Sequence, residues 1–338
     1  MLENIWFILW GVLWAVYFML GGFDLGIGVL LPFLAKTEGE KRTVLRTIAP
    51  FWDGNEVWLI TAGGVTFAAF PGAYAALFSS MYTPLMFVLF ALIFRIIGIE
   101  FAKDHKGARG LTLCNLSVFL GSLLASFLLG VAFANIFRGI PIDADGVFHG
   151  SLFTFLNPYG LAGGLFFLLL FLQHGALWLI AKSEGELHER AVRTAKTLWL
   201  VLAVCAVLFL VLTAFFTKLY ANYLSRPLLL AIPLICVCAL FAVRWFMARS
   251  MWWKAWTASS VTIFAATLFG VIGLYPNLLP STLNDAYSLT ISTSASTPLT
   301  LKIMLAVALV FVPVVITYQA LVYRLFRNKV KDGDEEPY

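Results

Sequence analysis

Long apolar segments occupy most of this chain, and short polar segments separate them. Each apolar segment is close to or longer than the roughly 20 residues that a helix needs to cross the hydrocarbon core of a bilayer. Strands of a membrane barrel would be about half as long and would alternate in polarity, and these segments do neither. The pattern predicts about nine membrane-spanning helices, near residues 5–34, 51–70, 74–100, 112–137, 160–182, 195–217, 227–248, 252–275 and 300–326.

The composition also favours an all-α integral membrane protein. Hydrophobic residues make up 61% of the 338 residues, charged residues make up 12%, and the mean hydropathy is +0.90. A soluble domain keeps a more mixed and more charged surface. The first apolar segment follows Met1-Leu2-Glu3-Asn4, which lacks basic residues, and it is too long for the apolar region of a signal peptide. We therefore expect the first helix to remain in the mature protein.

Lysine and arginine residues gather in alternate connections between the predicted helices. Those connections and the tail contain Lys36, Lys41, Arg42, Arg46, Lys103, Lys106, Arg109, Lys182, Arg190, Arg193, Lys196, Arg244, Arg249, Lys254, Arg324, Arg327, Lys329 and Lys331. The other connections hold only Arg138, Lys218, Arg226 and Lys302. Because cytoplasmic loops carry the excess of basic residues, we expect the amino terminus outside and the carboxyl terminus in the cytoplasm. The net charge of +5 then follows from topology and does not indicate a nucleic-acid partner.

A short polar motif occurs twice in the chain. Ala35-Lys36-Thr37-Glu38-Gly39-Glu40 follows the first predicted helix, and Ala181-Lys182-Ser183-Glu184-Gly185-Glu186 follows the fifth. A chance match of two short loops is the alternative. An offset of four helices would give both halves the same orientation, as in parallel-repeat membrane proteins. The hypothesis divides the chain into two four-helix bundles and a last segment with the ninth helix, at residues 1–138, 139–275 and 276–338.

Candidates for redox or metal chemistry are few. The four histidines are His105, His149, His174 and His188. Only His174 lies well inside a predicted helix, and a lone histidine in a bundle is more often hydrogen-bonded than bound to a metal. No Cys-x-x-Cys-His motif or acidic metal cluster occurs, and Cys236 and Cys238 point to different sides of their predicted helix. We expect no catalytic residue, cofactor ligand or metal ligand in this chain.

Acidic residues are more informative. Asp24 lies inside the first predicted helix, in its cytoplasmic half, and Gly21 and Gly28 share its face. These glycines leave room for water or for a close neighbouring helix. An aspartate at mid-membrane costs roughly 2.5–3.5 kcal/mol, so such a residue is a candidate for function, here the exchange of protons. The alternative is a structural aspartate, either paired with Arg95 or hydrogen-bonded to the backbone.

Four further ionisable residues fall in the cytoplasmic halves of the second and third predicted helices. Asp53 and Glu56 are three residues apart and share a face, although the same spacing is typical of a helix-capping box. Arg95 and Glu100 lie in the third helix, where Arg95 could extend toward the headgroups and Glu100 could pair with Lys103. Together with the aspartate of the first helix, they indicate an uptake route for a cation, which we expect to be a proton.

Several motifs, in order along the chain, resemble subunit II of the cytochrome bd-type quinol oxidases. The tract from Ile48 to Gly64, with Trp52-Asp53-Gly54-Asn55-Glu56-Val57-Trp58, is highly specific. The other matching motifs are Gly21-Gly22-Phe23-Asp24-Leu25-Gly26, Phe94-Arg95 with Glu100, Gly130-Val131-Ala132-Phe133-Ala134-Asn135, Gly185-Glu186-Leu187-His188 and Ser281-Thr282-Leu283-Asn284.

The resemblance implies a respiratory complex in a bacterial inner membrane. A homologous subunit I would carry two b-type haems and one haem d, oxidise quinol and reduce oxygen to water with cytoplasmic protons. A small single-helix accessory subunit can complete such a complex. Subunit II would bind no haem and would adopt a fold of two bundles plus one helix. Asp24, Asp53 and Glu100 match family positions for proton uptake, whereas some members have an amide at the position of Glu56.

We therefore expect this chain to support the haem subunit and to conduct protons to it. One alternative is a proton-coupled secondary transporter or channel that acts alone. Such a protein should have helices broken by glycine or proline at equivalent places in both halves. The fifth predicted helix has no aspartate in the region equivalent to Asp24, which weakens this alternative. A lipid-facing scaffold with merely paired acids is a third possibility.

Overall fold

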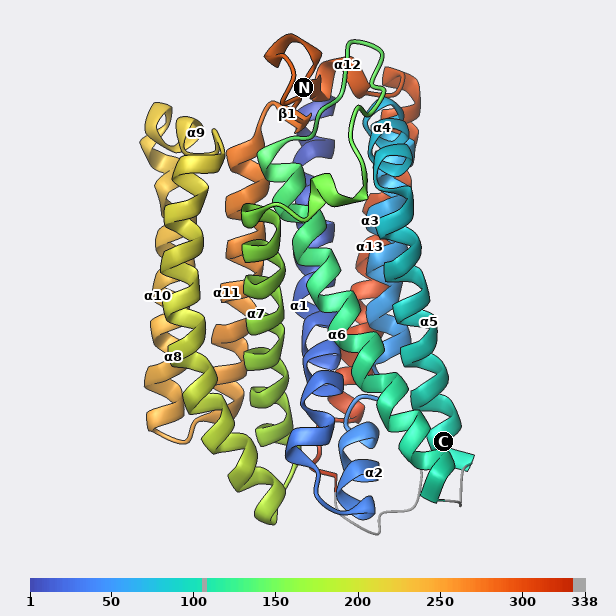
Figure 1. Cartoon of the computed structure of the whole chain (residues 1–338), viewed down its shortest axis with the longest axis vertical. Coiled ribbons are helices and arrows are strands. Elements are labelled where there is room, and N and C mark those ends of the chain that lie inside the picture. The colour runs from blue at the N-terminus through green and yellow to red at the C-terminus, as the bar shows by residue number, and fades with distance from the viewer. Residues whose placement is uncertain (105–107, 331–338) are drawn as a thin grey trace.

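The computed structural model describes residues 1–104 and 108–330, and most of them are helical (Figure 1). His105, Lys106, Lys331 and the side chain of Lys103 lie outside the described part. The long helices are α1 (Leu2–Leu34), α3 (Trp52–Ala69), α5 (Tyr82–Asp104), α6 (Ala108–Arg138), α7 (Pro158–Lys182), α8 (Gly185–Phe216), α10 (Ala231–Ala248), α11 (Trp252–Leu274) and α13 (Pro298–Leu325).

Shorter elements cover the two ends of these helices. Near the cytoplasmic end lies α2 (Glu38–Arg46), which begins with a capping box formed by Thr37 and Glu40. At the opposite end, two short strands pair in an antiparallel ladder. The elements at that end are α4 (Pro71–Ser80), α9 (Tyr220–Ser225), α12 (Ile291–Ser294), β1 (Asn277–Leu279), β2 (Leu289–Thr290) and the 3-10 turns Leu152–Phe155, Pro227–Leu230 and Asp285–Tyr287.

The predicted all-α membrane fold is confirmed. Within the described residues, eight helices are long and apolar enough to cross a membrane. The remaining predicted span is α3, a helix of 18 residues whose first turns carry Asp53, Asn55 and Glu56. Polar side chains at this depth need partners from neighbouring helices, so the start of α3 depends on its surroundings.

The third predicted span, 74–100, is not one helix. It comprises most of α4 and α5, with a break at Met81. Pro84 has no N–H to donate to the carbonyl of Ser80, and its ring disfavours a continuous helix through the preceding turn. The hydroxyl of Ser80 instead donates to the carbonyl of Ala76. The chain therefore ends one helix near the outer surface and starts another that descends through the membrane (Figure 1).

The central helix is α1, which packs against α3, α6, α7 and α11. Gly26 allows the closest contact, because a Cβ there would collide with the carbonyl oxygen of Phe171 in α7. A Cβ at Gly28 would likewise collide with the hydroxyl of Ser122 in α6. Of the two glycines predicted to leave room beside Asp24, Gly28 has a close neighbouring helix, whereas the atoms nearest to a Cβ at Gly21 would be those of Tyr17 in the same helix.

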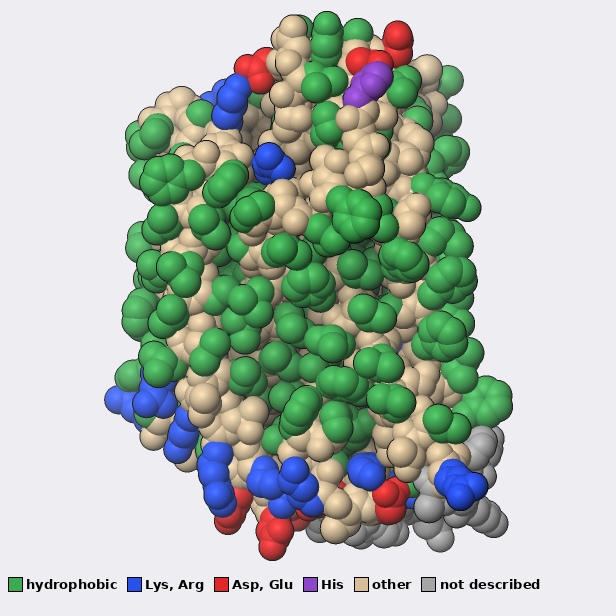
Figure 2. All heavy atoms as spheres, in the orientation of Figure 1, with side chains coloured by type: hydrophobic (Ala, Val, Ile, Leu, Met, Phe, Trp, Pro, Cys, Tyr) green, Lys and Arg blue, Asp and Glu red, His purple; other side chains and the backbone are tan. Residues whose placement is uncertain are grey.

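Charged side chains mark the two ends of the molecule. Figure 2 shows a broad band of hydrophobic side chains, with lysine and arginine side chains gathered below it near α2 and the start of α8. By the positive-inside rule this end is cytoplasmic. Since α1 starts at the other end and α13 finishes at the basic end, the amino terminus is outside (Figure 1).

Candidate functional site

Asp24 is the centre of a buried polar cluster. Its side chain is 2% exposed, and its Oδ1 atom lies 3.0 Å from Nη2 of Arg95, which is fully buried in α5. Its other oxygen, Oδ2, accepts a hydrogen bond of 3.0 Å from Nδ2 of Asn55 in α3. Three helices therefore meet at one carboxylate inside the membrane. The predicted alternative of pairing with Arg95 is what the geometry shows.

Asn55 connects this carboxylate to two further segments. Its Nδ2 also donates to the carbonyl of Leu20 in α1, at 3.0 Å. Its Oδ1 accepts a 3.0 Å hydrogen bond from the hydroxyl of Tyr323 in α13. Both side-chain atoms of Asn55 are thus used, and this fixes the orientation of the amide.

Arg95 binds a second carboxylate on its other terminal nitrogen. Nη1 donates to Oε1 of Glu56 at 3.1 Å, and the Glu56 side chain is 18% exposed. The capping-box alternative is wrong, because Phe51 is the N-cap of α3 and no side chain caps this end. One guanidinium therefore lies between two carboxylates, one almost fully buried and one partly exposed.

We call Asp24, Arg95 and Glu56 the triad. The other two predicted acids lie outside it. Asp53 lies in the first turn of α3, on the exposed face of this helix, three residues before Glu56. Glu100 is partly buried in α5, about 7 Å closer to the cytoplasmic end than Arg95 by helical rise. The five predicted residues share a region, and the structure brings Asp24, Arg95 and Glu56 into one hydrogen-bonded and ion-paired cluster.

Two side chains of α13 complete the surroundings of the cluster. Trp58 donates its indole N–H to Oε1 of Gln319 at 2.7 Å, and Nε2 of Gln319 donates to the carbonyl of Gly54 at 2.5 Å. With Tyr323 one turn further on, Gln319 fixes α13 against the start of α3. Sequence reasoning missed both residues. Their spacing of four residues on one face of an apolar helix was the available signal.

His174 is hydrogen-bonded on both ring nitrogens. Nε2 lies 3.1 Å from the carbonyl of Met19, which can only accept, so this nitrogen carries the proton. Nδ1 therefore accepts from the hydroxyl of Ser259 at 3.1 Å, and the ring stacks on Trp256 with centroids 5.1 Å apart. The described residues contain no group of three metal-binding side chains, and His174 has no free nitrogen for a haem.

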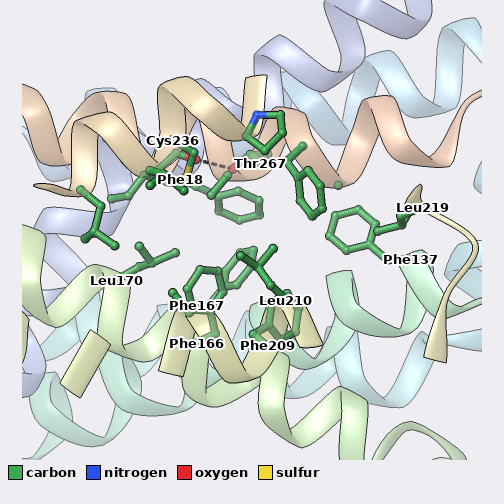
Figure 3. Close-up of a pocket in the computed structure, with 18 of the residues that line it drawn as sticks. Phe18, Phe137, Phe166, Phe167, Leu170, Phe209, Leu210, Leu219, Cys236 and Thr267 are labelled. Carbon is green, nitrogen blue, oxygen red and sulfur yellow. Dashed lines mark hydrogen bonds between the residues drawn. The ribbon is translucent and has the colours of Figure 1, made fainter. Parts of the chain in front are cut away.

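A separate cavity of about 80 Å³ lies between α7, α8, α10 and α11, closed on one side by Phe18 of α1 (Figure 3). Aromatic and aliphatic side chains line it, with Cys236 and Thr267 as its polar members. The residues that line it include no carboxylate and no histidine. None of these residues belongs to the Asp24 cluster, so the cavity is separate from it.

Comparison with known proteins establishes the family. The family described as cytochrome bd terminal oxidase subunit II matches residues 2–326. The chain belongs to this family. Cytochrome bd ubiquinol oxidase subunit 2 of Bacillus subtilis is 36% identical over 338 residues, covering 100% of this chain and 99% of the relative. Cytochrome bd-I ubiquinol oxidase subunit 2 of Escherichia coli K12 is 33% identical over 368 residues, covering 99% of this chain and 97% of the relative.

A solved structure supports the fold. The chain matches one in the bd oxidase from Geobacillus thermodenitrificans with a TM-score of 0.76, covering 96% of this chain and 98% of that one at 19% identity. The chain is thus one subunit of a bd-type quinol oxidase, a multi-pass protein of the bacterial inner membrane with a partner subunit I. This membership disfavours a transporter that acts alone.

Proposed function

We propose that this chain supports subunit I and delivers cytoplasmic protons to it through Asp24 and Glu56. In this proposal subunit I carries two b-type haems and one haem d, oxidises quinol and reduces oxygen to water. The observation that carries the proposal is Arg95, a buried cation that contacts both carboxylates, at 3.0 and 3.1 Å. Asp53 and Glu100 would extend the acidic region from this triad toward the cytoplasmic end.

The charges of the triad favour one bound proton. Two ionised carboxylates and one guanidinium leave a net charge of −1 inside the membrane, whereas one added proton makes the cluster neutral. At an effective dielectric constant of 20, two unit charges 4 Å apart interact by about 4 kcal/mol, so the uncompensated charge is costly. The guanidinium cannot release its own proton, so the transfer from Asp24 to Glu56 would use water, and Arg95 keeps an ionised partner throughout because it contacts both acids.

The exposed face of α3 gives this proton a destination. Asp53, Val57, Ile60, Gly64 and Phe67 are exposed at spacings of three and four residues, so they form one stripe along the helix. A carboxylate on such a face is unfavourable against lipid. We propose that subunit I covers this stripe, which would place Glu56 and Asp53 next to the haem subunit.

Replacing Asp24 by asparagine tests the proposal. The amide keeps the size of the side chain and removes its ability to carry a proton. We expect quinol-driven oxygen consumption to fall about tenfold or more, since a positioned proton-transfer group typically contributes about 10²–10⁴-fold. The haem spectrum of the purified complex should be retained. Asp143→Asn, a change in an exposed outer turn, is the control and should have no effect. A normal rate in Asp24→Asn would refute the proton role.

A further inference from the structure

We infer that protons reach Asp24 from the cytoplasm along the seam between α1, α5 and α6, by way of Asn115 and Ser122. This inference rests on the proposed proton role of Asp24. The side-chain nitrogen and oxygen of Asn115 and the hydroxyl of Ser122 are buried. None of these three atoms has a hydrogen-bond partner among the described residues. Most buried polar atoms in proteins do have a partner, which is protein or water. Polar atoms of this kind, inside a membrane protein, are suited to bind water.

The two residues lie on one face of α6. They are seven residues apart, which is close to two helical turns, or about 10 Å. Val118 lies between them on this face, and a Cβ added to Gly28 of α1 would contact Val118 and Ser122. A Cβ added to Gly98 of α5 would also contact Val118. The face therefore looks into the seam where the three helices meet.

The direction of the seam is from the cytoplasm to the triad. Helix α6 begins at the cytoplasmic end, so Asn115 is nearer to that end than Ser122. Ser122 faces Gly28, which is one turn on the cytoplasmic side of Asp24. Beyond it, a Cβ at Gly121 would lie 2.8 Å from Cβ of Arg95, whose Nε also has no hydrogen-bond partner among the described residues.

The unpaired polar atoms on this face stop at the level of the triad. Ser126 is one turn past Ser122 toward the outside, and its hydroxyl donates to the carbonyl of Ser122 at 2.7 Å. Its polar group is therefore satisfied within the helix. This contrast gives a matched control on the same helix, since Ser122 and Ser126 are both fully buried.

The transfer step needs only water and protons. A proton from cytoplasmic water would pass along water molecules hydrogen-bonded to Asn115 and Ser122 and protonate the Asp24 carboxylate. The proton already held by the triad would leave by Glu56, so the charge of the cluster is restored. Asn115 and Ser122 are positioning residues in this step, because they hold water and do not themselves carry the proton to the haem subunit.

The test uses the whole oxidase complex purified with Asn115→Leu, Ser122→Ala and the double variant. We expect the double variant to lower kcat roughly tenfold, with little change in the KM for quinol, and to raise the solvent isotope effect in heavy water. The single variant Asn115→Asp keeps a polar group of the same length and the native Ser122. Its rate should be close to that of the native complex. Ser126→Ala should behave as the native protein.

Two outcomes separate the route from the proton role itself. A double variant with native kcat and isotope effect, beside an impaired Asp24→Asn, would overturn the route and leave the role of Asp24 intact. A native rate in Asp24→Asn would overturn the proposed function instead. A loss of haem absorption in the double variant would show misassembly, and in that case the single Ser122→Ala variant decides: a native kcat and isotope effect there would overturn the route.

Discussion

The guanidinium of Arg95 is the group that connects the two carboxylates of the buried cluster. Arg95 contacts Asp24 and Glu56, and its side chain is fully buried. Removal of one member of a buried ion pair leaves an unpaired charge, which typically costs about 3–5 kcal/mol. We expect Arg95→Met to lower the thermal stability of the purified complex markedly, as measured by the temperature at which its haem spectrum is lost. Arg95→Lys should lose less stability, and equal losses in both variants would argue against the charge as the cause.

Glu56 should matter less than Asp24. Glu56→Gln keeps an oxygen that accepts from Arg95 and removes one of two competing negative charges, so the cluster stays intact. We expect turnover to fall by a smaller factor than in Asp24→Asn, since the resemblance implies that some family members have an amide here. Oxygen consumption of the two variants, measured side by side, gives the order. A larger loss in Glu56→Gln would contradict this division of roles.

The sequence identifies the acids at this scale but not their partners. Asp24 is visible because an aspartate between glycines interrupts an apolar helix. The hydrogen bond from Tyr323 to Asn55 joins residues 268 positions apart. It depends on how α13 rotates against α3, which periodicity alone does not define. For the same reason, the sequence does not predict that Asp53 is exposed whereas Glu56 contacts Arg95.

Among the helices, apolar length predicts most spans, and local chemistry decides the exceptions. The spans of α1, α6 and α7 are close to their predicted bounds because each is a long apolar run between polar turns. The break at Met81 depends on Pro84 and on serine hydroxyls that bind the carbonyls of the preceding turn. An apolar profile does not detect it, because the residues on both sides are equally hydrophobic.

The repeated motif produces different helices in the two halves. After α1 it starts α2, which ends at Arg46 shortly before Pro50, whereas after α7 it starts the continuous helix α8. The two copies are in contact, because Arg190 of the second half binds Glu40 of the first and donates to the carbonyl of Leu34 at 2.8 Å. The division into two repeated bundles stays a prediction. The contact shows that the two copies of the motif lie next to each other in the structure.

The contact between the motifs predicts a pH dependence at α2. Burial alone would raise the pKa of Glu40, but the N–H of Lys36 and the Arg190 guanidinium outweigh it and lower the pKa below its ordinary value of 4.5. A lowered pKa means that ionised Glu40 stabilises the folded state above the ordinary pKa and that this contribution is lost as the pH falls through the folded pKa. We expect Glu40→Gln to increase hydrogen exchange in α2 at neutral pH. The difference from the native protein, compared at equal pH, should vanish in acid. A difference that persists there would contradict the assignment.

For the whole molecule, the decisive question is which face meets subunit I. The two sides of the bundle differ: α8 and α10 lie on one side of α1, and α3 and α13 lie on the other, with α5 beyond them (Figure 1). Both edges expose aliphatic side chains, so hydrophobicity does not distinguish lipid from protein contact. Asp53 distinguishes the two sides, because its carboxylate lies on the exposed face of α3. A carboxylate is unfavourable on a surface that faces lipid.

Bulky substitutions on the two edges test this assignment. Ile60 on α3 is 73% exposed and Val207 on α8 is 61% exposed, so tryptophan at either position fits the isolated chain. Gly64 is a second site on the α3 face, because a Cβ there would meet nothing within 4 Å. If subunit I packs on α3, Ile60→Trp and Gly64→Trp will insert into the membrane but co-purify less haem with the tagged chain, while Val207→Trp will retain it. Equal haem in all three variants would place the haem subunit on another face, and Glu56 would then no longer point toward the proton's destination.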